Sequence, residues 1–73
     1  MADAKFLPDS PLYRLTGKQR KVIITAFKMG YYDVPRRVGS EDLAEQLGIR
    51  EPTLVMHRRK AERKLLSAIL GGQ

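Results

Sequence analysis

A single glycine between two helical patterns is the strongest constraint that this sequence places on its fold. Gly48 interrupts the segment SEDLAEQLGIREPTLVMHRRKAERKLL four residues after Ala44, a small residue of the kind found where two helices approach closely. The aliphatic residues Ile49 and Leu54 follow the glycine and can fill the angle between the helices. We therefore predict a helix-turn-helix in this part of the chain, with an ordinary helical hairpin as the alternative.

Another helix is predicted upstream of this motif. Thr16 and Gln19 stand three residues apart, which is the spacing of a capping box at the start of a helix. Gly30 can take the left-handed conformation that closes a helix. Apolar residues at helical spacing form the predicted buried stripe, which consists of Val22, Ile23, Ala26 and Phe27.

The two helices of the motif carry their own start and stop signals. Ser40 is the predicted N-cap of the shorter one, and Gly48 ends it. Pro52 suits the first turn of the longer one, where a missing N–H costs little, and this helix can run to about Leu70. The residues predicted to face inward are Leu43, Ala44 and Leu47 in the shorter helix and Leu54, His57, Ala61, Leu65, Ala68 and Ile69 in the longer one.

The chain as a whole is predicted to be all-α, with three main helices. No segment alternates convincingly with period two, although the sequence allows a short extended connector around Val34 to Val38. Residues 1–14 contain two prolines and no period, and we predict a flexible arm whose Leu12 and Tyr13 can dock on the body. The domain is predicted to span residues 15–70, followed by a tail at 71–73.

Charge narrows the range of partners. The 73 residues include 14 Lys and Arg against 8 Asp and Glu, and the resulting net charge of +6 suits a polyanion such as nucleic acid. The excess lies in the predicted third helix, where six basic and two acidic residues fall between Arg50 and Lys64. A surface whose charge serves only solubility is the alternative.

Other function classes find little support. The chain has no cysteine and one histidine, so disulfides and thiolate metal sites are excluded, and His57 is interpreted as a packed core residue. No apolar run reaches the roughly 18 residues of a membrane span, and neither a Gly-rich phosphate loop nor a Ser-His-Asp set is identifiable. We expect no enzyme activity, no metal, no cofactor, no membrane partner and a cytoplasmic location.

Four segments carry a family resemblance: LTGKQRKVI, GYYDVPRRV, DLAEQLGI and TLVMHRRKAERKLL. Over about Leu15 to Leu66 the chain resembles the bacterio-opsin activator type of helix-turn-helix domain, found in archaeal transcription regulators. The second half also resembles the LuxR-type domain. Both resemblances imply a transcription regulator that binds double-stranded DNA. Two positions depart from the family pattern: Arg50 replaces the usual serine or threonine cap of the recognition helix, and Arg58 replaces the usual aliphatic residue.

The recognition helix is expected over about residues 51–64, with its exposed face in the major groove. The predicted base-reading residues are Arg50, Glu51, Val55, Met56 and Arg59. Thr53, Lys60 and Arg63 are predicted to contact phosphates, which set the register without reading sequence. For each of these residues, a merely solvated side chain is the alternative.

The connector GYYDVPRRV is predicted to act as a brace. Tyr31 and Tyr32 would anchor the end of the first helix against the core, and Asp33, Val34 and Pro35 would turn the chain. The adjacent Arg36 and Arg37 would then contact DNA phosphates or the minor groove. The alternative is that they pair with the carboxylates of Asp33, Glu41 or Asp42.

Two other functions and two arrangements of the C-terminal part stay open at this stage. A helix-turn-helix can also serve as a protein-interaction module of the transcription machinery or as a non-specific architectural DNA binder. Leu66, Ile69 and Leu70 are more aliphatic residues than one helical stripe needs, so they can form a homodimer contact. Equally, this segment can fold back on the first helix and complete the core of the monomer.

Overall fold

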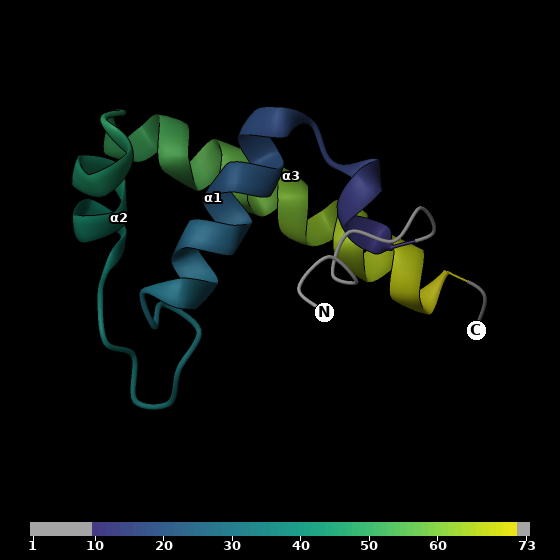
Figure 1. Cartoon of the computed structure of the whole chain (residues 1–73), viewed down its shortest axis with the longest axis horizontal. Coiled ribbons are helices and arrows are strands. Elements are labelled where there is room, and N and C mark those ends of the chain that lie inside the picture. Colours follow the sequence, from purple (N-terminus) through teal and green to yellow (C-terminus); the bar gives the residue numbers. More distant parts are fainter. Residues whose placement is uncertain (1–9, 72–73) are drawn as a thin grey trace, which may run out of the picture.

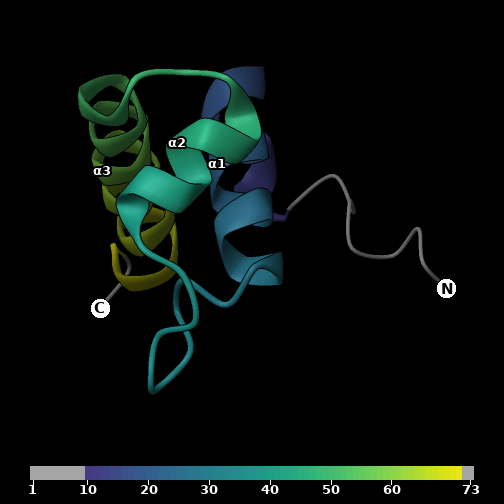
Figure 2. The same cartoon turned by 90° about the vertical axis from the view of Figure 1, so that its left-hand side faces the viewer.

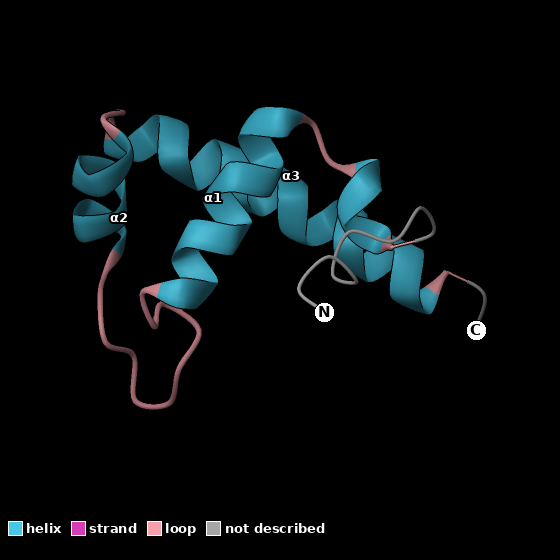
Figure 3. Ribbon diagram, viewed as in Figure 1, coloured by secondary structure: helices cyan, strands magenta, loops and turns pink. Residues whose placement is uncertain are grey.

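The structure is a computed structural model that describes residues 10–71. A short 3-10 helix, η2 (Pro11–Arg14), precedes three α-helices: α1 (Gly17–Lys28), α2 (Ser40–Leu47) and α3 (Glu51–Leu70). Within the described range there is no strand, so the all-α prediction is confirmed (Figure 3). The long helix α3 packs against α1, α2 and η2 (Figure 1).

The predicted signals of α1 are present. The Thr16 hydroxyl accepts a hydrogen bond from the Gln19 amide at 3.1 Å, and the Gln19 side-chain oxygen accepts one from the Thr16 amide at 3.2 Å, which completes the capping box. At the other end Gly30 takes a φ of +87°, and the Tyr31 amide donates back to the Ala26 carbonyl at 2.9 Å. This is the Schellman arrangement, in which the glycine reverses the chain and satisfies the last carbonyls of the helix.

The turn between α2 and α3 uses the same device. Gly48 has a φ of +69°, and the Ile49 amide donates to the Ala44 carbonyl at 3.0 Å. Only three residues separate the two helices, and α3 then begins at Glu51 with Pro52 in its first turn, as predicted. The sequence signal at Gly48 therefore identified the helix-turn-helix correctly.

The core is small and is built around close helix contacts. The central cluster combines residues of all three α-helices with one tyrosine of the connector: Val22 and Ala26 (α1), Leu43 and Ala44 (α2), Leu54 (α3), and Tyr31. Four partly buried residues pack against this cluster: Met29, Val38, Leu47 and Ile49. Alanines at the crossing points let the helix backbones approach, and Ala61 of α3 is also fully buried.

The prediction for Phe27 was wrong, because its side chain is 69% exposed. Successive residues of a helix point about 100° apart, so when Ala26 points into the core the side chain of Phe27 points to one side of it. In α3, Leu54 and Ala61 are buried and His57, Leu65 and Ala68 are half-buried, whereas Ile69 is exposed.

The predicted cap of α2 was displaced by one residue. Gly39 is the N-cap, and its amide donates to the Asp42 carboxylate at 3.1 Å, so the capping oxygen comes from inside the helix. Ser40 is instead the first helical residue, and its hydroxyl lies 3.4 Å from that of Tyr31. The extended connector around Val34 to Val38 is absent: four of these five residues form bends, and none of them lies in a strand.

The region before α1 is described in part. Residues 1–9 of the predicted arm lie outside the described residues, as do residues 72–73 of the predicted tail. The remainder of the arm forms η2, capped by the Ser10 hydroxyl, which accepts from the Leu12 amide at 3.2 Å. No helix within residues 10–71 is long and apolar enough to cross a membrane.

Candidate nucleic-acid interface

One face of α3 carries an exposed basic stripe. Met56, Arg59, Lys60 and Arg63 are all exposed and stand at positions i, i+3, i+4 and i+7, so they share one side of the helix. The buried Leu54 lies on the opposite side. Figure 2 shows α1 and α2 together on one side of α3, so the stripe faces away from the rest of the domain. Two of the predicted base readers thus share this face with two of the predicted phosphate contacts.

The start of α3 presents the remaining predicted readers. Arg50 is the N-cap residue in an extended conformation, and its side chain makes no capping hydrogen bond, in keeping with the loss of the usual serine or threonine. Arg50 and Glu51 are both exposed next to the turn. Val55 and Thr53 are half-buried at opposite edges of the stripe, so they are less accessible than their spacing alone suggested.

Arg58 points away from this face and belongs to a polar network inside the fold. Its guanidinium donates to both carboxylate oxygens of Glu62, at 3.0 and 2.8 Å, and lies 5.5 Å from the centre of the Tyr31 ring. The side chain is only 18% exposed. The guanidinium does not reach outward to solvent, because a carboxylate one helical turn away holds it against the connector.

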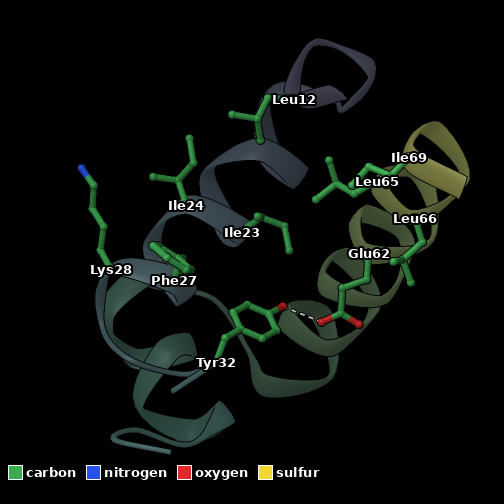
Figure 4. A pocket seen from close by; sticks show the side chains of 10 residues that line it. All are labelled: Leu12, Ile23, Ile24, Phe27, Lys28, Tyr32, Glu62, Leu65, Leu66 and Ile69. Carbon is green, nitrogen blue, oxygen red and sulfur yellow. Dashed lines mark hydrogen bonds between the residues drawn. The ribbon is translucent and has the colours of Figure 1, made fainter. Parts of the chain in front are cut away.

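Tyr32, in the connector that follows α1, joins the same network. Its hydroxyl donates to the Glu62 carboxylate, as the dashed line in Figure 4 shows. Burial and this hydrogen bond raise the pKa of the Tyr32 hydroxyl well above its usual range. Arg58, Glu62 and Tyr32 thus tie the connector to the middle of α3. Sequence reasoning missed this link, although the Arg58–Glu62 spacing of four residues was a visible signal.

Of the two tyrosines predicted to anchor the connector in the core, Tyr31 does so and Tyr32 does not. Tyr31 is 4% exposed and packs in the core, with the two rings edge to face at 5.1 Å between centroids. Tyr32 is partly exposed and makes the hydrogen bond to α3 instead.

The two connector arginines contact residues of the connector itself. The Arg36 guanidinium stacks 4.2 Å from the centre of the Tyr31 ring, and Arg37 pairs with Asp33 at 3.2 Å. Arg37 keeps 76% of its side chain exposed, so this ion pair leaves most of the guanidinium open to solvent. In Figure 2 the connector lies at the bottom of the domain and the turn between α2 and α3 at the top, so these arginines are not adjacent to the start of α3.

No group of three or more His, Cys, Asp or Glu side chains that would suit a metal ion occurs in the described part of the chain. The interface carries guanidinium, ammonium and hydroxyl donors, together with the Glu51 carboxylate. These groups bind phosphate oxygens and base edges.

A helix-turn-helix whose second helix exposes a basic stripe is typical of one class of protein, the helix-turn-helix DNA-binding domains. Residues 15–67 match the model of a family described as an HTH DNA-binding domain. The chain belongs to this family, the bacterio-opsin activator type of helix-turn-helix domain. The LuxR-like resemblance of the second half is not confirmed.

Curated relatives come from the archaeon Haloferax volcanii. The transcriptional regulator NarO is 41% identical over 56 residues, covering 77% of this chain and 26% of NarO. The dimethyl sulfoxide reductase transcriptional activator is 39% identical over 62 residues, covering 85% of this chain and 29% of the activator. A third protein of this organism is 47% identical over 53 residues, covering 73% of this chain and 9% of its own length.

The chain thus spans less than a third of the length of each of these relatives. No solved structure matches it.

Proposed function

We propose that this chain binds double-stranded DNA as the DNA-binding part of a transcription regulator, with α3 in the major groove over about residues 51–64. The observation that carries this proposal is the exposed stripe of Met56, Arg59, Lys60 and Arg63 on the second helix of the motif. We propose no catalytic role. Since the target is chromosomal DNA, we also propose a cytoplasmic location.

The stripe suggests how the contacts divide. Arg59 and Arg50 can form bidentate hydrogen bonds with guanine, Glu51 can accept from cytosine, and Met56 and Val55 offer apolar contact to a thymine methyl group. Thr53, Lys60 and Arg63 are proposed to bind phosphates.

Arg36 and Arg37 are proposed as a separate phosphate contact, made by the connector. Their guanidiniums remain exposed despite the stacking on Tyr31 and the ion pair with Asp33. Because the connector and the turn before α3 lie at opposite ends of the domain in Figure 2, we propose this contact for a different stretch of the DNA backbone.

Titration of random-sequence duplex DNA at two salt concentrations tests the function. We expect measurable affinity at low salt and a steep loss at higher salt, because phosphate contacts release counterions. No binding at low salt would reject DNA as the partner and favour a protein-interaction module. Competition between random and selected duplexes then separates sequence-specific from architectural binding.

We further propose that two copies of the chain associate through an apolar hollow between α1 and the C-terminal half of α3. This hollow has a volume of about 670 Å³ (Figure 4). Its apolar lining consists of Leu12, Ile23, Ile24, Phe27, Leu65, Leu66 and Ile69. Leu66 and Ile69 are more than half exposed, so this segment does not fold back to complete the monomer core. Leu70 is also exposed but lies outside the hollow, on the neighbouring face with Arg63.

The position of the hollow along α3 favours a second copy as its occupant. The proposed base-reading residues run from position 50 to position 59, and we call this stretch the reading segment. From its middle, at residue 55, to residue 67 the helix rises about 18 Å. If the two α3 helices run antiparallel, a two-fold axis at residue 67 separates the reading segments by about 36 Å, which is close to one turn of DNA.

Sedimentation equilibrium tests this association. Leu66→Gln with Ile69→Gln should shift the protein to the monomer, whereas Val34→Gln, a polar change at an exposed aliphatic residue of the connector, should not. A double variant that remains dimeric would reject this surface.

A further inference from the structure

A second hollow lies where the start of α1 meets the first two turns of α3. Its volume is about 240 Å³. Val22, Leu47 and Ile49 form an apolar floor, and Lys18, Lys21, Thr53 and His57 supply the polar lining. Three parts of the chain therefore converge here: the first two turns of α1, the turn of the helix-turn-helix, and the recognition helix.

The lining is strongly cationic. Lys18 and Lys21 are exposed, and neither forms an ion pair within residues 10–71. The ammonium of Lys64 is held at the same end of α1, because it donates to the Gln19 side-chain oxygen at 3.0 Å. The N-terminal end of α1 adds the positive pole of its helix dipole. No carboxylate lines the hollow, so its charge is not neutralised locally.

The hollow lies on one flank of the recognition helix. Thr53 and His57 stand one helical turn apart, on the side of α3 that faces α1, next to the basic stripe. Figures 1 and 2 both show the start of α1 at the top of the domain and the connector at the bottom. When a helix occupies the major groove, the two phosphate backbones run along its two flanks. The hollow and the connector are therefore placed to meet different backbones.

We propose that Lys18, Lys21, Thr53 and His57 form a binding site for a DNA phosphate, and that the floor of Val22, Leu47 and Ile49 receives the apolar face of the adjoining deoxyribose. The two ammonium groups supply charge, and the hydroxyl and imidazole supply hydrogen-bond donors to phosphate oxygens. The site rests on the proposed DNA-binding function and adds α1 to the surface that carries it. It contacts the backbone only, so it strengthens binding without reading sequence.

Comparison of Lys21→Gln with Arg14→Gln tests the site. Both residues are exposed, but Arg14 belongs to η2 and lines neither of the two hollows, so the two variants lose the same charge at different places. The logarithm of the binding constant for a random duplex is plotted against the logarithm of the salt concentration. Lys21→Gln should reduce the slope by about 0.9, as for one lost phosphate contact, and Arg14→Gln should leave it unchanged. Circular dichroism checks that both variants fold.

A second measurement reports the position of the contact. The imidazole proton resonances of His57 should move when duplex DNA is added to the wild type, and should move less in Lys18→Gln with Lys21→Gln. The order of preference among different duplexes should be the same in the double variant and the wild type.

The outcomes separate this site from the function on which it rests. A wild type that does not bind duplex DNA contradicts the proposed function itself. A wild type that binds, with equal slopes for the wild type and Lys21→Gln, overturns the phosphate site alone. Equal losses in Lys21→Gln and Arg14→Gln overturn it as well, because they reveal a general effect of net charge.

Discussion

At Arg58 a charged side chain occupies the edge of the apolar face of α3. The adjacent Tyr31 ring and the two-pronged hydrogen bond to Glu62 accommodate it, and Tyr32 closes the network from the connector. Partial burial lowers the pKa of Arg58, but the hydrogen bond to Glu62 raises it. The net result is a pKa above the usual value for arginine. The ion pair with Glu62 thus favours the charged guanidinium, and this residue serves the fold rather than the interface.

Tyr32→Phe tests this network through its dependence on pH. The folded-state pKa of Tyr32 lies above the unfolded value of 10.0, so its contribution to the free energy of unfolding is fully present below about pH 10 and is lost as the pH rises further. We expect Tyr32→Phe to lower that free energy by about 1 kcal/mol at neutral pH. The decline above pH 10 should also become shallower. Urea unfolding across this range measures both effects.

Tyr13→Phe is the matched control, since it removes a hydroxyl but leaves Tyr32 and Glu62 intact. It should keep the alkaline decline of the wild type. If Tyr32→Phe declined as steeply as Tyr13→Phe, Tyr32 would not be linked to Glu62 in solution.

The two glycines with positive φ should differ in their tolerance of a side chain. At Gly48 a Cβ would meet no atom within 4 Å, so Gly48→Ala should cost only the backbone strain, about 1 kcal/mol. At Gly30 it would lie 2.6–2.8 Å from three carbons of Arg37, so Gly30→Ala should destabilise the protein further. Urea denaturation of both variants measures the difference, and equal losses would contradict the packing of Arg37 over Gly30.

At the scale of the elements, signals that depend on neighbours in sequence were predicted well. The capping box of Thr16 and Gln19 and the helix stop at Gly48 involve residues at most a few positions apart, and both are present. The exposure of Phe27 and the partial burial of Thr53 and Val55 depend on how the helices pack against one another, which no local pattern encodes. For the same reason the hollow of Lys18, Lys21, Thr53 and His57 was invisible in the sequence, since its residues are up to 39 positions apart.

Within α3, Arg59 and Arg63 should respond differently to truncation, although both lie on the same exposed stripe. Arg59→Ala should weaken binding to a preferred duplex by about 1–3 kcal/mol and relax the preference at one base pair. Arg63→Ala should weaken binding to all duplexes alike. Competition with single-base variants of the preferred duplex distinguishes them. Identical effects would contradict the division of the stripe into reading and phosphate-binding residues.

At the scale of the whole molecule, the domain offers four surfaces with separate proposed tasks. We propose that the stripe of α3 faces the major groove, that the flanks at the start of α1 and at the connector approach the two backbones, and that the apolar hollow beside Leu66 and Ile69 receives a second copy. The small core built around Leu43 and Leu54 holds these surfaces in fixed relation.

The central claim is that the stripe of α3 carries the binding to DNA. Its most direct test is the salt dependence of duplex binding for Lys60→Gln, compared with Arg14→Gln, which loses the same charge from η2. We predict that the stripe variant lowers the slope of the logarithmic plot by about 0.9 and that the control keeps the slope of the wild type. A stripe variant that binds DNA as the control does, with the same slope, would contradict the account.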